Sequence, residues 1–509
     1  MDMASAKFER TSKRIGASAI FPRLAPALAV ILLATLLIAL NPVVFVGGGN
    51  DDFHYLQAAR CFAENGFCVA PDHWWSRLPL VAPLGASIAL FGASRASLAI
   101  VPFAYSLAAI LLFVAMMQRQ FGRVPATIAG LALVATPVIA DDLVRLAVDL
   151  AELAWLLAAL FCLQSRARGG DFRWLVLAGM CAALAVETRA TSLVALPVFA
   201  AALLLMKSRT RDLAAFACGF AAPMAAQSIA DLAFTGNALH HWQLQLGHTA
   251  LPSTQLPQAA ANSGSPILNL AIIRAWPPAA GIDSHWSVRA LVNLFASPEA
   301  GLTLCAAALV AIASLRELSW RSPGGRTLIL AICGGALWFV SLVFLLAIDP
   351  RPRMFEPVVA VAAAVIGVLV AQRIRNADFL LPIVLGSLIL GYGLFHAMSA
   401  VPIAPAAAAT AHELRKDPAA MVDARSAKFL ALDAGGNIRI FAGGQSGRLL
   451  ILAPGPCPST PSARLGNWAL QRQQRFERPQ PAVLRWMRDT GLLRPLEAPG
   501  LCEYVPKRD

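Results

Sequence analysis

A polar stretch directly after the first long apolar run carries the side chains best suited to chemistry. Residues 47–92 contain the adjacent carboxylates Asp51 and Asp52, followed by His54, Tyr55, His73 and Arg77. Carboxylates, a basic residue and aromatic side chains are costly to place at a membrane boundary, so they indicate a functional site there. The alternative is an ordinary solvated loop that happens to be acidic, and the local residues alone do not choose between the two.

Further charged residues lie near the ends of later apolar runs, on the side predicted for Asp51. They are Asp141, Asp142, Arg145, Asp149, Glu187, Arg189, Arg351 and Arg353. At helical spacing, Arg145 and Asp149 would share one helix face, which also allows a plain internal salt bridge.

Such a set of side chains suits one kind of chemistry. Arginines bind a phosphate or diphosphate through charge-assisted, often bidentate hydrogen bonds. A carboxylate can take the proton of an acceptor hydroxyl as general base. The arginines would then stabilise the charge on a departing lipid phosphate, so no strong general acid is needed.

The composition excludes several other classes of protein. Of 509 residues, 58% are hydrophobic and only 14% are charged, against about 25% charged in a soluble domain, and the mean hydropathy is +0.62. The net charge of +13 does not indicate nucleic acid binding, because much of it lies in short loops between apolar runs. The chain has no P-loop and no glycine-rich dinucleotide fingerprint, so an ATP-driven transporter is not expected.

Long apolar runs position these side chains. Each run of about 18 or more residues can cross the hydrocarbon core, so we predict an α-helical polytopic membrane protein with about 11 spans. The predicted spans lie near 24–46, 96–117, 124–140, 147–165, 173–187, 191–206, 213–234, 299–315, 327–348, 354–371 and 378–398. The first run is too long for a cleaved signal peptide, so we expect an uncleaved span after a cytoplasmic N-terminus at 1–23.

Loop charge supports this topology. Alternate connections are rich in Arg or Lys, as cytoplasmic loops are; they lie at 118–123, 165–173, 207–211, 316–326 and 372–378. The extracytoplasmic side then receives the first loop (47–95), the Asp141-Asp142 turn, residues 187–189, a long loop (235–298), residues 349–357 and the tail. A single tilted helix over 173–206, in place of two short spans, would invert everything downstream. The short, proline-bounded segment 78–92 predicts an interfacial or re-entrant helix.

The tail at 399–509 has the composition of a small soluble α/β module. The segments KFLALD, IRIFAGG and LLILAP predict short strands separated by glycine turns. The segment PAVLRWMRDTGLL predicts an amphipathic helix that ends at Gly491. An odd number of spans after a cytoplasmic N-terminus would place this module outside the cytoplasm.

The nine cysteines fall into two groups. Five lie in predicted spans and are expected to be small buried hydrophobic side chains: Cys162, Cys181, Cys218, Cys305 and Cys333. The other four lie in segments predicted to be extracytoplasmic, where disulfides persist. We expect the bridges Cys61–Cys68 and Cys457–Cys502, although spacing alone does not establish the pairing. No closed metal-ligand set is visible, so a divalent metal on the carboxylates stays an open alternative.

The order and spacing of these motifs resemble the GT-C superfamily of integral membrane glycosyltransferases. The resemblance covers roughly residues 47–400. It is greatest to the branch with protein O-mannosyltransferases, lipid A aminoarabinose transferases and RgtA/B/C/D-like transferases. That family has an acidic pair followed by Tyr in its first extracytoplasmic loop, here Asp51-Asp52 and Tyr55.

Four further elements carry the resemblance. A Lys-Pro-Pro-Leu-like segment leading to Phe-Gly resembles Arg77-Leu78-Pro79-Leu80 through Phe91-Gly92, with Arg for the usual Lys. The later elements resemble Arg145 to Asp149, Gly179 to Arg189 (again Arg for Lys) and Arg351 to Met354, without the usual Tyr. The Arg-for-Lys changes are compatible with phosphate binding, but they argue against transferring the substrate of the aminoarabinose enzymes.

The resemblance implies a GT-C fold at 24–398 and an enzyme of the inner (plasma) membrane. It would move a sugar, with inversion, from a polyprenyl-phosphate-linked donor to a lipid, glycan or protein acceptor on the extracytoplasmic face. Asp51 would be the base, supported by Asp52 and Asp149. The implied substrate- and phosphate-binding residues are His54, Tyr55, His73, Arg77, Arg145, Arg189, Arg351 and Arg353.

Two other functions explain part of the pattern. A non-enzymatic transporter or lipid flippase would line its path with the same charges. Inverted repeats would favour that function, and the sequence shows none. A membrane-anchored binding protein that acts through its tail would leave the charges near the membrane unexplained. A nucleic acid partner is not expected.

Overall fold

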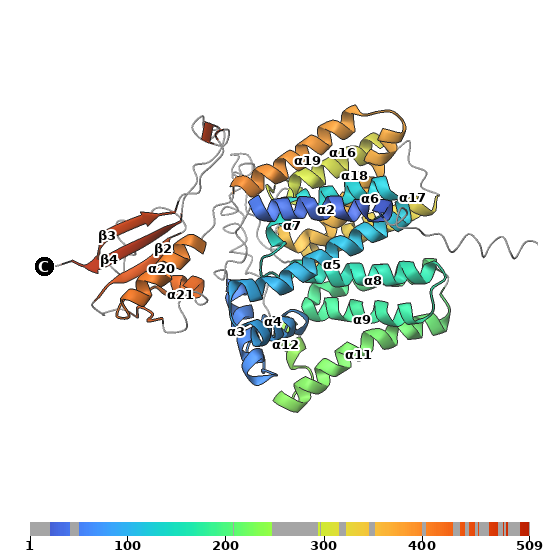
Figure 1. Ribbon diagram of the computed structural model, residues 1–509. Helices are drawn as coiled ribbons and strands as arrows, with labels where there is room; N and C mark the ends of the chain where they lie inside the picture. Colours follow the sequence, from blue (N-terminus) through green and yellow to red (C-terminus); the bar gives the residue numbers. More distant parts are fainter. Residues whose placement is uncertain are drawn as a thin grey trace, which may run out of the picture.

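The computed structural model consists of a helical bundle followed by a small unit with a four-stranded sheet (Figure 1). The predicted fold class, a helical membrane protein with a small C-terminal α/β unit, is confirmed. The described residues are 21–40, 50–206, 208–246, 294–295, 297–314, 322–345, 352–399, 404–430, 438–442, 447–453, 457, 468–476, 482, 485–486 and 499–507.

Each predicted span corresponds to a helix. These helices are α2 (Phe21–Leu40), α5 (Arg95–Phe121), α6 (Arg123–Ala135), α8 (Asp149–Ala167), α9 (Arg173–Thr188), α10 (Leu196–Leu205), α11 (Thr210–Thr235), α16 (Gly301–Ser314), α17 (Pro323–Val340), α18 (Glu356–Arg375) and α19 (Leu380–Ser399). By length and composition, 6 helices in the described part of the chain can cross a membrane, and the remaining apolar helices are shorter.

Two breaks shape the end of the bundle that carries the site. The predicted span at 124–140 was too long, because α6 ends at Ala135 and Thr136 is extended before Pro137. A residue before proline avoids the helical region, which explains this end. The segment 173–206 forms two helical pieces, as predicted. Arg189 is extended between α9 and the 3-10 helix η2 (Ala190–Ala195), which leads into α10.

Small residues allow the helices to pack closely. A Cβ added to Gly179 on α9 would lie 2.1 Å from the carbonyl oxygen of Phe216, and one added to Gly219 on α11 would lie 2.1 Å from that of Val176. Glycine at such crossings lets two backbones touch. The apolar core then continues through α8, α5, α6 and α18.

Shorter elements lie at one end of the bundle. Helix α3 (Asn50–Asn65) runs crosswise to α5 and α8 on the side of the C-terminal unit (Figure 1). The Cys61–Cys68 disulfide ties its last turn to the following loop. The segment 78–92 forms a helix as predicted, α4 (Leu78–Phe91), with Pro79 in its first turn. A short helix, α12 (His240–Leu246), follows α11, and residues 247–293 of the predicted long loop lie outside the described part.

The C-terminal unit has the helices α20 (Ala404–Lys416) and α21 (Ala424–Leu430) beside a sheet of order β1-β2-β4-β3. Strands β1 (Met421–Val422) and β2 (Leu449–Ala453) are parallel, while β2 and β3 (Trp468–Arg475) each pair antiparallel with β4 (Gly500–Pro506). The second predicted disulfide, Cys457–Cys502, is also present.

The strand predictions for this unit were partly wrong. LLILA forms β2, and Ile440 of IRIF makes an isolated bridge to Val422. Residues 428–430 of KFLALD are instead the last residues of α21. Asp423 precedes this helix, and its Oδ1 accepts a hydrogen bond from the backbone N–H of Ser426 at 3.2 Å. Such a local cap favours a helix over a strand. Most of the predicted helix at 481–493 lies outside the described residues.

The free cysteines also correct a prediction. Cys162 is buried, but Cys218, Cys305 and Cys333 are exposed on α11, α16 and α17. These helices present many apolar side chains on their outer faces. In a membrane protein such faces meet lipid, where a small apolar thiol needs no burial inside the protein.

Candidate active site

Asp51 lies in the first turn of α3 and contacts two distant parts of the chain. Its Oδ2 accepts a hydrogen bond from Nη2 of Arg353 at 2.7 Å, and its Oδ1 accepts one from the Trp74 indole at 3.0 Å. Arg353 belongs to the 3-10 helix η4 (Pro352–Phe355), which leads into α18. The Asp51 and Arg353 side chains remain 26% and 25% exposed. The carboxylate is therefore held in place but still accessible.

The surroundings of Asp51 keep it ionised. Burial raises the pKa of Asp51, but the charges of Arg353 and Arg77 and the hydrogen bonds from Arg353 and Trp74 outweigh that effect, so the pKa lies below its usual value. Because an ordinary Asp titrates near pH ~3.9, this carboxylate carries a full negative charge at neutral pH. It can accept a proton without first losing one.

Aromatic rings gather beside this carboxylate. The Trp74 ring stacks on His54 with centroids 4.2 Å apart, and the His73 ring lies 3.8 Å from it. Asp72 organises the turn, because its Oδ1 accepts the backbone N–H groups of Trp74 and Trp75, while its Oδ2 lies 2.8 Å from Nδ1 of His54. The two histidines thus shape the Trp74 wall of the site.

Tyr55 and Arg77 form a second, deeper contact. The Arg77 guanidinium donates to the Tyr55 hydroxyl and also lies over its ring, 5.6 Å from the centroid. Both side chains are buried. Burial raises the pKa of Tyr55 to about 12, so the hydroxyl stays protonated. Arg77 is therefore engaged inside the wall.

A second ion pair connects the start of α8 to the end of α9. Nη1 of Arg189 lies 2.5 Å from Oδ1 of Asp149 and 3.6 Å from Oε2 of Glu152. Glu152 also accepts hydrogen bonds from the hydroxyls of Ser192 at 2.6 Å and Thr191 at 3.2 Å. The extended backbone of Arg189 brings its side chain to the start of α8.

Arg145 does not lie where its spacing predicted. Helix α8 begins at Asp149, so Arg145 precedes it in a bend and cannot share a helix face with Asp149. Its Nη1 instead lies 3.8 Å from Oδ1 of Asp142, and its side chain is 40% exposed. Burial raises the pKa of Asp142, although the Arg145 charge opposes this.

A buried group of acids lies beneath these cations. Within the described part of the chain, Asp142, Asp149 and Glu356 each have a side-chain oxygen without a hydrogen-bond partner. No described group of three or more His, Cys, Asp or Glu side chains has the arrangement to hold a metal ion. The open alternative of a divalent metal therefore has no ligand set among these residues, and we derive no step through a metal.

Most of the predicted site residues come together. The charges of Asp149, Asp51 and Asp142 all act on Arg353, which therefore links the two ion pairs. Asp52 is buried, and its charge acts on Arg145. Arg351 lies outside the described residues.

Several side chains of the site were not predicted from the sequence. Glu152 falls three residues after Asp149 on α8, a spacing that places both on one helix face and could have revealed it. Glu356 follows Arg353 at the same interval. The contact from Trp74 to Asp51 left no signal, because no periodicity relates a loop side chain to one 23 residues away.

The crosswise α3 with its acidic first turn lies at one end of a bundle of apolar helices. Residues 79–226 match the sequence profile of the family described as dolichyl-phosphate-mannose-protein mannosyltransferase. No curated protein sequence matches the chain. The predicted resemblance to the GT-C superfamily of membrane glycosyltransferases is confirmed by this match and by the following structures.

Three solved structures share the fold. ArnT from Cupriavidus metallidurans in the apo state has a TM-score of 0.51 at 13% identity, covering 84% of this chain and 93% of ArnT. ArnT bound to undecaprenyl phosphate gives 0.50 at 12% identity, covering 96% and 98%. The oligosaccharyltransferase of Archaeoglobus fulgidus, tethered to an acceptor peptide with an NVT sequon, gives 0.51 at 14% identity, covering 83% of this chain and 64% of its own.

Proposed function

We propose that this protein is a glycosyltransferase that moves a sugar from a polyprenyl-phosphate-linked donor to an acceptor hydroxyl. The observation that carries the proposal is the Asp51–Arg353 contact, which joins an ionised, accessible carboxylate to an accessible guanidinium. ArnT, which shares the fold, was crystallised with undecaprenyl phosphate, and the oligosaccharyltransferase was crystallised with an acceptor peptide. The acceptor here is a lipid, a glycan or a protein.

The reaction needs a base and a place for the leaving charge. Asp51 takes the proton of the acceptor hydroxyl as its oxygen attacks the anomeric carbon. The bond from that carbon to the phosphate oxygen breaks, and its electron pair stays on the polyprenyl phosphate. Attack from the face opposite the leaving group inverts the anomeric centre.

The exposed arginines are the best placed for the phosphate. A guanidinium has five N–H donors, so Arg353 can keep Asp51 and still bind an oxyanion. The Arg145 side chain is more exposed, and the charges of Asp142 and Asp149 act on it as they do on Arg353. Arg77 and Arg189 would have to leave Tyr55 and Asp149 to reach the donor, so we assign them to holding the site walls.

The proposed location is the inner membrane, with the site and the C-terminal unit on the extracytoplasmic side. Both disulfides support this, because such bonds persist in oxidising compartments. Both disulfides also lie in parts of the chain near the site. Cys61 belongs to α3, and Cys502 belongs to the C-terminal unit. That unit contacts α3, because Lys428 on α21 lies over the ring of Phe53. A reporter fused after residue 405 and active only in the cytoplasm would contradict this assignment.

The test is sugar transfer by purified protein from a synthetic polyprenyl-phosphate donor. We expect Asp51→Asn to insert normally and to lose about 10²–10⁴-fold in turnover, the usual contribution of a general base. Asp52→Asn should be milder, since Asp52 is buried, whereas the Asp51 side chain is 26% exposed. Asp171→Asn is the matched control, because Asp171 is 60% exposed in the connection between α8 and α9.

Two outcomes would contradict the proposal. The anomeric configuration of the product, measured by NMR, should be inverted, and retention would exclude direct attack by the acceptor. If Asp51→Asn and the Asp51/Asp52 double variant keep near wild-type turnover, the carboxylates have no catalytic role. The flippase alternative would then be tested by donor movement across liposomes.

A further inference from the structure

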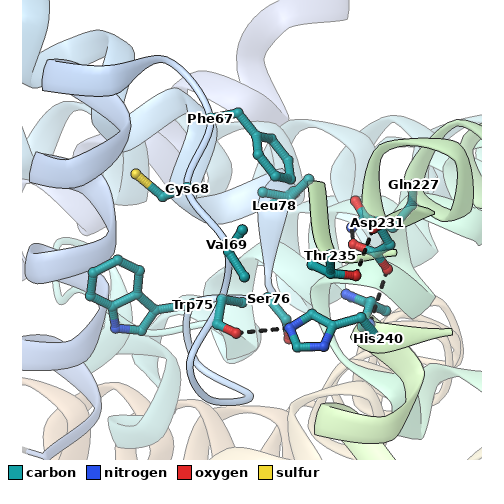
Figure 2. Close-up of a pocket in the computed structure, with 12 residues that line it drawn as sticks. Phe67, Cys68, Val69, Trp75, Ser76, Leu78, Gln227, Asp231, Thr235 and His240 are labelled. Carbon is teal, nitrogen blue, oxygen red and sulfur yellow. Dashed lines mark hydrogen bonds between the residues drawn. The ribbon is translucent and has the colours of Figure 1, made fainter. Parts of the chain in front are cut away.

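The loop between α3 and α4 is anchored from behind at two points. Nε2 of His240, on α12, lies 3.0 Å from the carbonyl oxygen of Ala70, and Gln245 on the same helix donates to the Ser76 hydroxyl at 3.2 Å. Figure 2 shows this side of the loop, which faces α11 and α12. The turn between these anchors, residues 72–75, is the part of the loop that reaches the candidate active site.

Asp72 opens this turn and holds it through two backbone hydrogen bonds. Its Oδ1 accepts the backbone N–H of Trp74 at 2.9 Å and that of Trp75 at 3.1 Å. An aspartate that binds the N–H groups two and three residues later fixes the backbone as an N-cap fixes the first turn of a helix. The Ser76 hydroxyl closes the same turn by donating to the carbonyl oxygen of His73 at 2.9 Å. Asp72 therefore fixes the backbone position from which the Trp74 side chain extends.

Asp72 also contacts one of the rings that pack on Trp74. Its Oδ2 lies 2.8 Å from Nδ1 of His54, and the His54 ring stacks on the Trp74 indole with their planes 17° apart. The His73 ring lies 3.8 Å from the same indole. The capped turn and the two histidine rings together fix the orientation of the indole, whose N–H donates to Oδ1 of Asp51 at 3.0 Å.

We infer that Asp72 is a positioning residue for sugar transfer: it holds the Trp74 indole in place, and the indole holds the Asp51 carboxylate in the orientation in which it acts as base. Arg353 holds the other carboxylate oxygen at 2.7 Å, so the two contacts fix the plane of the carboxylate. Each carboxylate oxygen can accept a second hydrogen bond, which leaves room for the acceptor hydroxyl. The inference rests on the proposed function, because it requires Asp51 to be the base.

The test is sugar transfer by purified Asp72→Ala, with Asp171→Ala as the matched control. Asp171 makes the same kind of turn between α8 and α9, because its Oδ1 accepts the backbone N–H of Arg173 at 2.9 Å. We expect Asp72→Ala to lower kcat by about 10-fold, the effect of a base that is held less firmly in place, with little change in KM for the donor. Asp171→Ala should keep wild-type kcat, although each variant loses one capped turn.

A double-mutant cycle separates positioning from a general loss of structure. Because Asp72 acts through Trp74, the losses of kcat in Asp72→Ala and Trp74→Phe should not multiply in the double variant, whereas losses at independent sites do. In an Asp51→Asn background, Asp72→Ala should lower turnover no further, because no base is left to position. Losses that multiply fully in both cycles would overturn the inference.

The pH profile and a conservative variant give two further readouts. Burial raises the pKa of Asp51, while the charges of Arg353 and Arg77 and the Trp74 hydrogen bond lower it. Loosening that hydrogen bond should move the acid limb of kcat/KM in Asp72→Ala to higher pH, which a loss of stability alone would not do. Asp72→Asn keeps an oxygen for the two backbone N–H groups, so it should retain most of the wild-type kcat.

Several outcomes would overturn the inference and leave the proposed function in place. One is a wild-type protein that transfers sugar while Asp72→Ala keeps the same kcat. Another is a kcat of Asp72→Asn as low as that of Asp72→Ala. If Asp72→Ala does not fold, Asp72→Gly removes the same side chain at less cost to a capped turn, and wild-type kcat in that variant would also overturn the inference. Absence of transfer by the wild-type protein would instead contradict the proposed function.

Discussion

Two ion pairs meet at the site end of the bundle, and they differ in how much of them water can reach. Asp51–Arg353 joins α3 to η4 across 302 residues of sequence, and each side chain stays about a quarter exposed. Asp149–Arg189 joins the start of α8 to the end of α9, with exposures of 2% and 11%. Glu152 lies beside Arg189 as a second carboxylate.

We propose that this difference separates residues that act on the substrate from residues that hold the structure. A partly exposed pair contributes little to stability. Asp51 and Arg353 can therefore replace their mutual contact with contacts to a substrate at a small loss of stability. A buried pair is stable only while every partner is in place, so Asp149 and Arg189 hold the helix ends that surround the site. The four predictions below test this division, from the largest expected effect to the smallest.

The largest effect is expected from Arg189→Ala. It leaves Asp149 and Glu152 buried without their cation, which typically costs about 3–5 kcal/mol of unfolding free energy. Arg353→Ala, the matched removal of the exposed pair, should cost about 0–1 kcal/mol. Thermal unfolding of both variants in detergent measures the difference, and equal losses would show that exposure does not separate the two pairs.

The next effect concerns the disulfide beside the exposed pair. Cys61–Cys68 ties α3, which carries Asp51, to the loop that carries Trp74. Replacing both cysteines with Ser should lower the unfolding free energy by about 2–4 kcal/mol, the usual contribution of a disulfide. Chemical denaturation would report the loss, with Cys305→Ser on the exposed face of α16 as control. An unchanged denaturation midpoint would show that the Cys61–Cys68 disulfide does not stabilise the part of the chain that carries Asp51.

A smaller effect should follow from Trp74→Phe. The substitution keeps an aromatic ring beside His54 but removes the indole N–H that binds Oδ1 of Asp51. The indole N–H holds the carboxylate in position, so we expect turnover to fall about 10–100-fold, less than for loss of the base itself. The unfolding free energy should fall by no more than about 1.5–3 kcal/mol, the value of a hydrogen bond to a charged group. Trp75→Phe, next in the chain, is the control for kcat. A large loss of stability with full turnover would mean that Trp74 stabilises the wall of the site and does not position Asp51.

The smallest effect is a pH dependence. Burial raises the pKa of Asp51, but Arg353, Arg77 and Trp74 hold it below the usual value. Its stabilising contribution is present above the unfolded pKa of ~3.9 and is lost as pH falls through the lower folded pKa. In Arg353→Ala, burial is less opposed, so the acid limb of residual kcat/KM should move to higher pH. A limb that stays in place would exclude Asp51 as the group that titrates.

Much of the fold and part of the site could be predicted because they depend on local patterns. Apolar runs long enough to span a membrane have few alternatives, since every backbone polar group must find a partner inside its own helix. Two cysteines seven residues apart in a polar segment likewise have short reach, and the Cys61–Cys68 bridge is present. The strand prediction was wrong at 428–430, because a local cap at Asp423 favoured a helix.

The sequence by itself determined the class of protein and the acidic pair after the first span, because both follow from residue types that lie close together in the chain. The helix α3 that carries this pair was not predicted. Only the tertiary structure decided which cation meets which carboxylate. Arg145 pairs with Asp142 instead of Asp149, and Arg353 reaches Asp51 from the far end of the chain. Charges attract any opposite partner, so the choice among them depends on how close packing brings the helix ends, which no local pattern encodes.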